Sequence, residues 1–350
     1  MEKIIFLILS FLSGATELGG ILYALRTNFN IVEIVGLGLA YQIGNLVPNP
    51  IKLNRKASIF SAVLSSCCFV TFKFINANYW LLFVGFVLIA MSIQSLRSLQ
   101  KENVSTPVKR LFRIIGFLGS PLMSINVFVC VGVILICVST VTKWNYIKCE
   151  LNRPKVGFIN AIMITHQIHY FAYAYFILIL IANIISKSFN KNSISQILIG
   201  VLFTLGWLTY TSISVVLKKE KYFRYFITGH LFLTIVLFSL AYNSDNYWSI
   251  ILWILTGFGG GTVFCIEKIN NLTNESTKRD IVFSENIGHI IGVIFGLVVY
   301  LFSTKTNYPV YLSSIFAGVT ALLMIIYYVT KTSKFNINAK ENKAQKIIDK

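Results

Sequence analysis

The chain has 350 residues, of which 55% are hydrophobic and 13% are charged, about half of the ~25% charged residues that soluble proteins carry. So few charges cannot cover the surface of a soluble protein of this length. The composition therefore predicts an all-α polytopic membrane protein that lies in a lipid bilayer. The formal net charge of +18 does not indicate a nucleic-acid partner, because the basic residues are scattered through short connectors and form no single patch.

Apolar runs of membrane-spanning length follow one another along the chain. The first run, residues 4–25, is too long for the apolar region of a signal peptide and is not followed by a cleavage pattern, so we expect a retained helix. Further runs of this kind predict transmembrane helices at 31–47, 57–75, 79–96, 157–185, 194–217, 222–242, 246–266, 281–303 and 308–330.

The apolar stretch 111–142 is long for one helix and short for two, since a crossing takes about 20 residues. If it folds as a hairpin, the chain has twelve helices with both termini inside, and few basic residues stay outside. These are Arg26, Lys73, Lys187, Lys191 and Lys305. The alternative of eleven helices places most basic residues outside, against the positive-inside rule. We therefore predict twelve helices, with the hairpin turn near Pro121 or Asn126.

The two halves of the chain repeat each other in organisation. The basic connector at 52–56 recurs about 166 residues later at 218–224, and such an offset predicts two six-helix halves. The expected organisation is an N-terminal six-helix half at 1–142, a cytoplasmic connector at 143–156, a C-terminal six-helix half at 157–330 and a cytoplasmic tail at 331–350. The Lys- and Asn-rich tail is expected to be disordered or to lie on the membrane surface.

In this organisation the chain resembles a divergent member of the major facilitator superfamily of transporters. The loop that carries the family's signature, between helices two and three, has its counterpart in Gly44–Lys56, where Asn54 stands in place of an acidic residue. Gly116–Pro121 is similar to a Gly- and Pro-containing motif on helix five of the family's antiporters. The resemblance also implies a cytoplasmic gate, which we assign to Lys52, Arg55 and Lys56.

Ionisable side chains inside membrane helices are costly and usually face a cavity or a partner. Glu17 lies in the first predicted helix, and Glu285 and His289 are neighbours one turn apart on the eleventh. Polar and aromatic side chains share one face of the seventh helix at ~100° per residue. They are His166, His169, Tyr170 and Tyr173. The resemblance implies that helices one and seven line a central cavity, across which Glu17 and this face would meet.

Because histidine changes its charge near physiological pH, we expect these groups to form a proton and substrate cavity. Its predicted members are Glu17, His166, His169, Tyr170, Tyr173, Glu285 and His289. The alternative is that the same side chains only hydrogen-bond the helices together. His230 stands alone on the ninth helix and is expected to serve packing, whereas Trp207 and Trp253 lie deep enough to line a pocket.

These features predict a secondary active transporter, not an enzyme, that moves a small organic solute across a bacterial cytoplasmic membrane. The buried histidines and carboxylates favour proton-coupled export by antiport. An acyltransferase-like membrane enzyme and a non-transporting scaffold are the alternatives. The cysteines and histidines show no metal-binding spacing, so we expect no metal and no cofactor. Both termini are expected in the cytoplasm, and the chain is expected to act as a monomer.

Overall fold

The computed structural model describes residues 2–46, 55–75, 78–99, 106–142, 157–188, 193–217, 221–273 and 276–348. Lys52 of the expected gate and the whole connector 143–156 lie outside these ranges. Every described element is a helix, as expected for apolar segments in lipid, where the backbone N–H and C=O groups must pair within the chain.

The N-terminal half contains α1 (Glu2–Arg26), α2 (Ile31–Leu46), α3 (Arg55–Phe74), α4 (Tyr79–Leu99), α5 (Thr106–Gly119), the 3₁₀ turn η1 (Ser120–Leu122) and α6 (Ile125–Val141). The C-terminal half contains α7 (Phe158–Ser188), α8 (Ser193–Val216), α9 (Tyr222–Tyr242), α10 (Trp248–Gly260), η3 (Gly261–Val263), α11 (Phe264–Thr273), α12 (Lys278–Ser303) and α13 (Tyr308–Ile348). Because α10, η3 and α11 succeed one another as one interrupted span, the described residues form twelve spans.

Nine helices of the described chain are long and apolar enough to cross a membrane, and α2 and α6 are shorter apolar helices. Helix α5 is shorter still and carries basic residues, which is why hydropathy alone does not identify it. The hairpin predicted in 111–142 is confirmed, with Pro121 inside η1 and Ser124 capping the start of α6. The predicted start at 111 is wrong, because α5 begins at Thr106.

The tenth span is interrupted, although the sequence analysis predicted one helix at 246–266. Three consecutive glycines, Gly259 to Gly261, end α10 and begin the 3₁₀ turn η3. Glycine is a poor helix former because it loses the most backbone freedom on folding, so a run of glycines weakens an α-helix at that point. Helix α11 then continues the span to Thr273.

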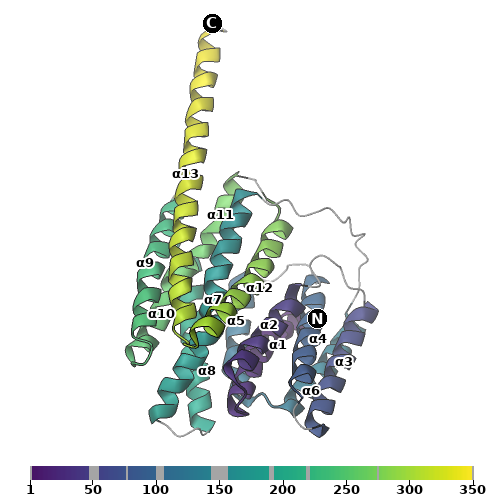
Figure 1. Ribbon diagram of the computed structural model, residues 1–350. Helices are drawn as coiled ribbons and strands as arrows, with labels where there is room; N and C mark the ends of the chain where they lie inside the picture. The colour runs from purple at the N-terminus through teal and green to yellow at the C-terminus, as the bar shows by residue number, and fades with distance from the viewer. Residues whose placement is uncertain are drawn as a thin grey trace.

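The helices gather into two groups, one of α1–α6 and one of α7–α13 (Figure 1). Between the groups, α2 contacts α7 and α12, and α5 contacts α8. With an even number of spans, both termini lie at the same end of the bundle. We call it the basic end, where α2, α4 and α6 finish and α3, α5 and α7 begin.

Two glycine contacts set the helix spacing around the middle of the molecule. A Cβ on Gly116 of α5 would collide with the carbonyl oxygen of Phe11 on α1, and one on Gly14 of α1 would collide with the carbonyl of Arg113 on α5. On α12, Cβ atoms at Gly288, Gly292 and Gly296 would collide with α7. Small residues at such spacing let two membrane helices approach at backbone distance. They bring α5 onto α1 and α12 onto α7.

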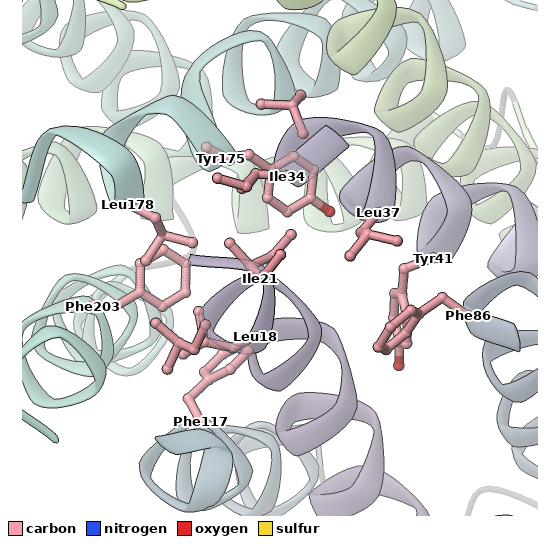
Figure 2. Close-up of a cluster of buried hydrophobic side chains, with 14 of the residues drawn as sticks. Leu18, Ile21, Ile34, Leu37, Tyr41, Phe86, Phe117, Tyr175, Leu178 and Phe203 are labelled. Atoms are coloured by element: carbon pink, nitrogen blue, oxygen red, sulfur yellow. The ribbon is translucent and has the colours of Figure 1, made fainter. Parts of the chain in front are cut away.

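An apolar cluster fills the space between the two groups of helices (Figure 2). Leu18 and Ile21 of α1 lie near Leu178 of α7 and Phe203 of α8, and Phe117 of α5 lies beside Leu18. These five side chains, which we call the apolar plug, are each at most 6% exposed. The plug joins the two halves away from the basic end.

Helix α13 is longer than the predicted last helix. It runs without a break to Ile348 and projects beyond the other helices (Figure 1). Of the two expectations for the chain from Lys331, disorder is wrong for the described backbone, which is helical to Ile348.

Candidate transport site

A buried ion pair joins α1 and α5 in the middle of the molecule. Nη2 of Arg113 lies 2.5 Å from Oε2 of Glu17, and Glu17 is only 9% exposed. The close α1–α5 packing at Gly14 and Gly116 positions this pair. Arg113 also lies 5.4 Å from the ring centroid of Trp207 on α8, so its guanidinium faces the C-terminal half. An ion pair at this depth is retained where a fixed charge is used or compensated.

Gln42 of α2 connects this ion pair to the other half. Its amide nitrogen donates to Oε1 of Glu17 at 2.9 Å and to the hydroxyl of Tyr175 on α7 at 2.8 Å. Because the carboxylate only accepts hydrogen bonds, the NH₂ group of Gln42 must face Glu17 and its Oε1 must face away. Nδ1 of His289 on α12 lies 3.2 Å from that Oε1. The amide orientation therefore assigns the proton of His289 to Nδ1.

Glu285 completes the network on the side nearer the basic end. Its Oε1 lies 3.9 Å from Nε2 of His289, one turn along α12. Since Nδ1 of a neutral His289 carries the proton, Nε2 offers a lone pair toward Glu285 and can accept a second proton. The side chain of Glu285 is 42% exposed and that of His289 is 13% exposed, so the network is more accessible at Glu285 than at Glu17. The α12 helix that carries both residues starts with a capping box of Thr277 and Asp280.

Aromatic side chains line two small cavities beside this network. The first cavity borders Glu17 and the apolar plug, and the second borders His169, Tyr173 and Trp253. Tyr170 and Trp207 line both cavities, with ring centroids 5.8 Å apart. Each cavity has room for about one water molecule. Tyr170 and Trp207 therefore border two small spaces, neither of which has room for an organic solute in this structure.

Two nitrogen atoms beside the aromatic wall of the first cavity are buried and have no hydrogen-bond partner among the described residues. They are Nε1 of Trp207 and Nε of Arg113. The ring of Trp253, by contrast, donates from Nε1 to the carbonyl of Leu202 at 3.2 Å. Buried donors are almost always paired in native proteins, so an unpaired one calls for a ligand or a water. Trp207 and Arg113 therefore present two donors to whatever fills the site.

The expectation that His166 and His169 face Glu17 is not met. The two histidines face α9 instead. Nδ1 of His166 lies 2.8 Å from Nε2 of His230 on α9, and Nε2 of His169 lies 3.0 Å from the same His166 atom. All three rings are at most 1% exposed. The seventh helix is buried all round, so a helical projection identifies a shared face but not the neighbour that this face meets. His230, expected to stand alone, is part of this cluster.

The expected gate is described at Arg55 and Lys56. Nη2 of Arg55 donates to the carbonyl of Thr140 near the end of α6 at 2.7 Å, a contact within the N-terminal half. Lys56 is exposed. In this structure Arg55 therefore caps a neighbouring helix end, where basic side chains interact favourably with free carbonyls.

Arg97 is a further basic group of the site. It lies in α4, and its Nη1 reaches the hydroxyl of Ser13 on α1 at 3.5 Å, one turn from Glu17. Its Nε is buried without a hydrogen-bond partner among the described residues. Arg97 directly follows the helix predicted at 79–96, and Arg113 lies at the basic start of the stretch 111–142, so neither was predicted to lie within the site. Arg113, Arg97, Gln42 and Tyr175 are the site residues that it missed.

Comparison with known proteins places the fold. The chain is similar to the crystal structure of the nucleoside transporter NupG, with a TM-score of 0.60 and 13% identity over 94% of this chain and 98% of that one. A point mutant of NupG matches with a TM-score of 0.62 and 14% identity, over 94% of this chain and 99% of the mutant's chain. A bacterial homologue of the iron transporter ferroportin, in an outward-facing state, matches with a TM-score of 0.58 and 11% identity, over 94% of this chain and 100% of the homologue's chain. No protein-family model and no curated protein matches the chain.

The matched structures are transporters, and they cover nearly the whole of this chain and of their own. The predicted likeness to the major facilitator superfamily is therefore confirmed at the level of the fold. The chain is a multi-pass membrane protein with that fold.

Proposed function

We propose that the protein is a secondary active transporter that exports a small organic solute from a bacterium in exchange for protons. The observation that carries this proposal is the polar network from Arg113 through Glu17 and Gln42 to His289, which crosses between the two halves. In a transporter built from two halves, the site lies at their interface and the halves move around it. A network that spans this interface couples its own protonation to that movement.

The aromatic wall and the free donors indicate the kind of solute. Tyr170, Trp207 and Phe117 offer ring faces at one side of Arg113, with Phe117 and Trp207 centroids 5.3 Å apart. Flat rings stack well on such faces, and the unpaired donors of Trp207 and Arg113 call for acceptor oxygen or nitrogen atoms. We therefore propose a flat-ring solute with hydrogen-bond acceptors. The similarity in fold to a nucleoside transporter makes nucleosides the first probes.

Proton coupling follows from competition within the network. The charge on Glu17 holds Arg113 through Nη2 and leaves Nε of Arg113 for an acceptor of the solute, so a proton on Glu17 releases the guanidinium and lowers the affinity for the solute. A proton entering at Glu285 reaches His289 first, whose Nε2 faces it, and the amide of Gln42 joins His289 to Glu17. Proton and solute thus alter the same ion pair, which is what exchange through one site requires.

The apolar plug supports an orientation for this structure. The plug is buried and lies away from the basic end, whereas Glu285 lies near the start of α12, at the basic end, with 42% of its side chain exposed. The positive-inside rule puts the basic end in the cytoplasm, together with both termini. On this proposal the plug closes the site to the outside of the cell, and the site would open to the cytoplasm on the side of Glu285.

The test is transport in inverted membrane vesicles, with labelled nucleosides first and a metabolite extract second, with and without an imposed pH gradient. We expect solute uptake that depends on the gradient and disappears when a protonophore collapses it. Glu17→Gln should abolish gradient-driven uptake but keep solute exchange, because Gln retains the shape and cannot release a proton. Glu285→Gln and His289→Asn should lower gradient-driven uptake together, since the two groups interact.

Two results would contradict the proposal. Gradient-driven uptake that persists in both Glu→Gln variants would remove the proton site. Absence of uptake for every solute of the extract, with the purified protein folded, would remove the transport function itself.

A further inference from the structure

The structure brings three histidines together beside the second cavity, which only His169 of the three borders. His166 and His169 lie one turn apart on α7, and His230 lies on α9. One ring nitrogen of each, Nδ1 of His166 and Nε2 of the other two, belongs to a group of atoms within 4.8 Å of one another. Among the described residues, no carboxylate or cysteine joins this group. We propose that the three histidines bind one monovalent copper ion, Cu(I).

The hydrogen-bond partners of the three rings decide where each ring can carry its proton. Nδ1 of His230 lies 2.9 Å from the carbonyl oxygen of Phe226, which can only accept, so a neutral His230 carries its proton there. Its Nε2 then points a lone pair at Nδ1 of His166, 2.8 Å away. Nε2 of His169 lies 3.0 Å from that same Nδ1.

Neutral rings cannot satisfy both of these short contacts. If Nδ1 of His166 carries a proton, it donates to His230 and has none left for His169. If it carries a lone pair, it accepts from His169 and meets the lone pair of His230. A cation placed among the three nitrogens resolves the conflict, because all three then direct lone pairs at it.

One of the three remaining ring nitrogens has the partner that a metal-bound histidine usually has. Metal-binding histidines usually donate their other N–H to a carbonyl or carboxylate, and His230 does so to Phe226. Nε2 of His166 and Nδ1 of His169 are buried without a hydrogen-bond partner in the described structure, so neither ring is held in place by a polar neighbour on its far side.

The surroundings select the ion. The cluster is at most 1% exposed and carries no described counter-charge, and the cost of burying a charge rises steeply with its size. A divalent zinc ion also takes four ligands in closed protein sites, and the cluster supplies three. Imidazole is a good ligand for copper, and Cu(I) accepts three ligands in a plane with one positive charge.

The required movement is small. Three bonds of about 2.0 Å in a plane separate the ligand atoms by about 3.5 Å. The nitrogen pairs now at 2.8 and 3.0 Å would therefore move apart by about 0.5–0.7 Å, and the third pair, which lies within 4.8 Å, would adjust to the same spacing by side-chain rotation. The site lies within the C-terminal half, so the ion would fix α7 against α9 as a resident ion and would not be carried across the membrane.

The test uses the full chain, purified in detergent and stripped of metal with a chelator. Cu(I) is titrated without oxygen against a chromophoric competitor, and zinc is titrated separately. We expect one Cu(I) per chain, an X-ray absorption spectrum with three nitrogen ligands at about 2.0 Å, and a rise in the thermal midpoint on binding. His169→Gln and His230→Leu should each weaken Cu(I) binding by about 100-fold or more. His289→Gln is the matched control, since it removes a membrane histidine outside the cluster.

Several outcomes would overturn the proposal. Zinc bound more tightly than Cu(I) by the same histidines would refute the monovalent ion. Cu(I) binding that survives in His169→Gln and His230→Leu, with both variants folded by circular dichroism, would place copper elsewhere. If the folded wild-type protein binds neither metal, and its thermal midpoint instead rises on acidification only while all three histidines are present, the occupant is a proton.

Discussion

Arg113 on α5 and Glu17 on α1 are held at 2.5 Å by a helix contact in which neither helix has a side chain at the crossing, because Gly116 and Gly14 stand there. The ion pair therefore depends on the close packing of the two helices. Removing either partner leaves the other charge in a site of low polarity. Glu17→Gln or Arg113→Met alone should destabilise the protein by about 2–4 kcal/mol, somewhat less than a fully buried pair, because Arg113 keeps 28% of its side chain exposed.

The double variant separates pairing from packing. Glu17→Gln with Arg113→Met removes both charges, so it should recover at least half of the stability lost in the less stable single variant. The measurement is chemical or thermal unfolding in detergent. Strictly additive losses would show that the two side chains stabilise the fold independently.

Trp207 and Trp253 allow a comparison between two buried indoles. Trp207→Phe keeps a flat ring in the wall but removes a donor that has no partner among the described residues, so solute affinity should fall about tenfold with stability unchanged. Trp253→Phe removes a donor already used by Leu202, so it should lower stability more than affinity. Solute binding and unfolding are measured on both. Equal effects of the two variants on affinity would show that the Nε1 of Trp207 does not meet the solute.

Gly116 offers a test of the helix contact itself. Gly116→Ala puts a methyl group against the backbone of Phe11, which cannot rotate away, and should cost about 1–3 kcal/mol and reduce transport. Gly318→Ala is the control, because its nearest neighbouring atom would be the hydroxyl of Thr234 at 3.6 Å, an ordinary contact. Comparable melting temperatures for the two variants would argue against close packing of α1 on α5.

The sequence predicted the fold well where one physical quantity decides it. Most basic residues fall on the cytoplasmic side of the membrane when 111–142 is a hairpin and on the outer side when it is one helix. Pro121 does lie at the turn of the hairpin. Periodicity gave the shared face of His166 and His169, but not the partner of that face, since α7 is surrounded by helices. Arg113 was missed because it lies at the edge of an apolar run, where a basic residue usually belongs to the connector. Gln42 was missed because an uncharged amide costs much less to bury than a charge, so its place in an apolar run does not mark it as a site residue.

Topology provides a prediction independent of the site. A chain whose single cysteine is the natural Cys149, within 143–156, should react with a membrane-impermeant maleimide only after the cells are opened, because this connector is expected in the cytoplasm. A chain whose single cysteine is Lys305→Cys, between α12 and α13, should react with intact cells. Labelling of Cys149 from outside would invert the orientation and with it the direction of export.

The glycine run that divides α10 from α11 has a mechanical consequence. Gly257 and Gly260 line the second cavity together with Tyr170 and Trp207, so the interruption of this span adjoins the site. A helix broken by a 3₁₀ turn bends there at little cost, whereas an unbroken span must tilt as a rod. The volume beside Trp253 can thus change by flexing one span while the contact between the two halves stays in place. Admission of a solute and reorientation of the halves are then separate events, each with its own rate.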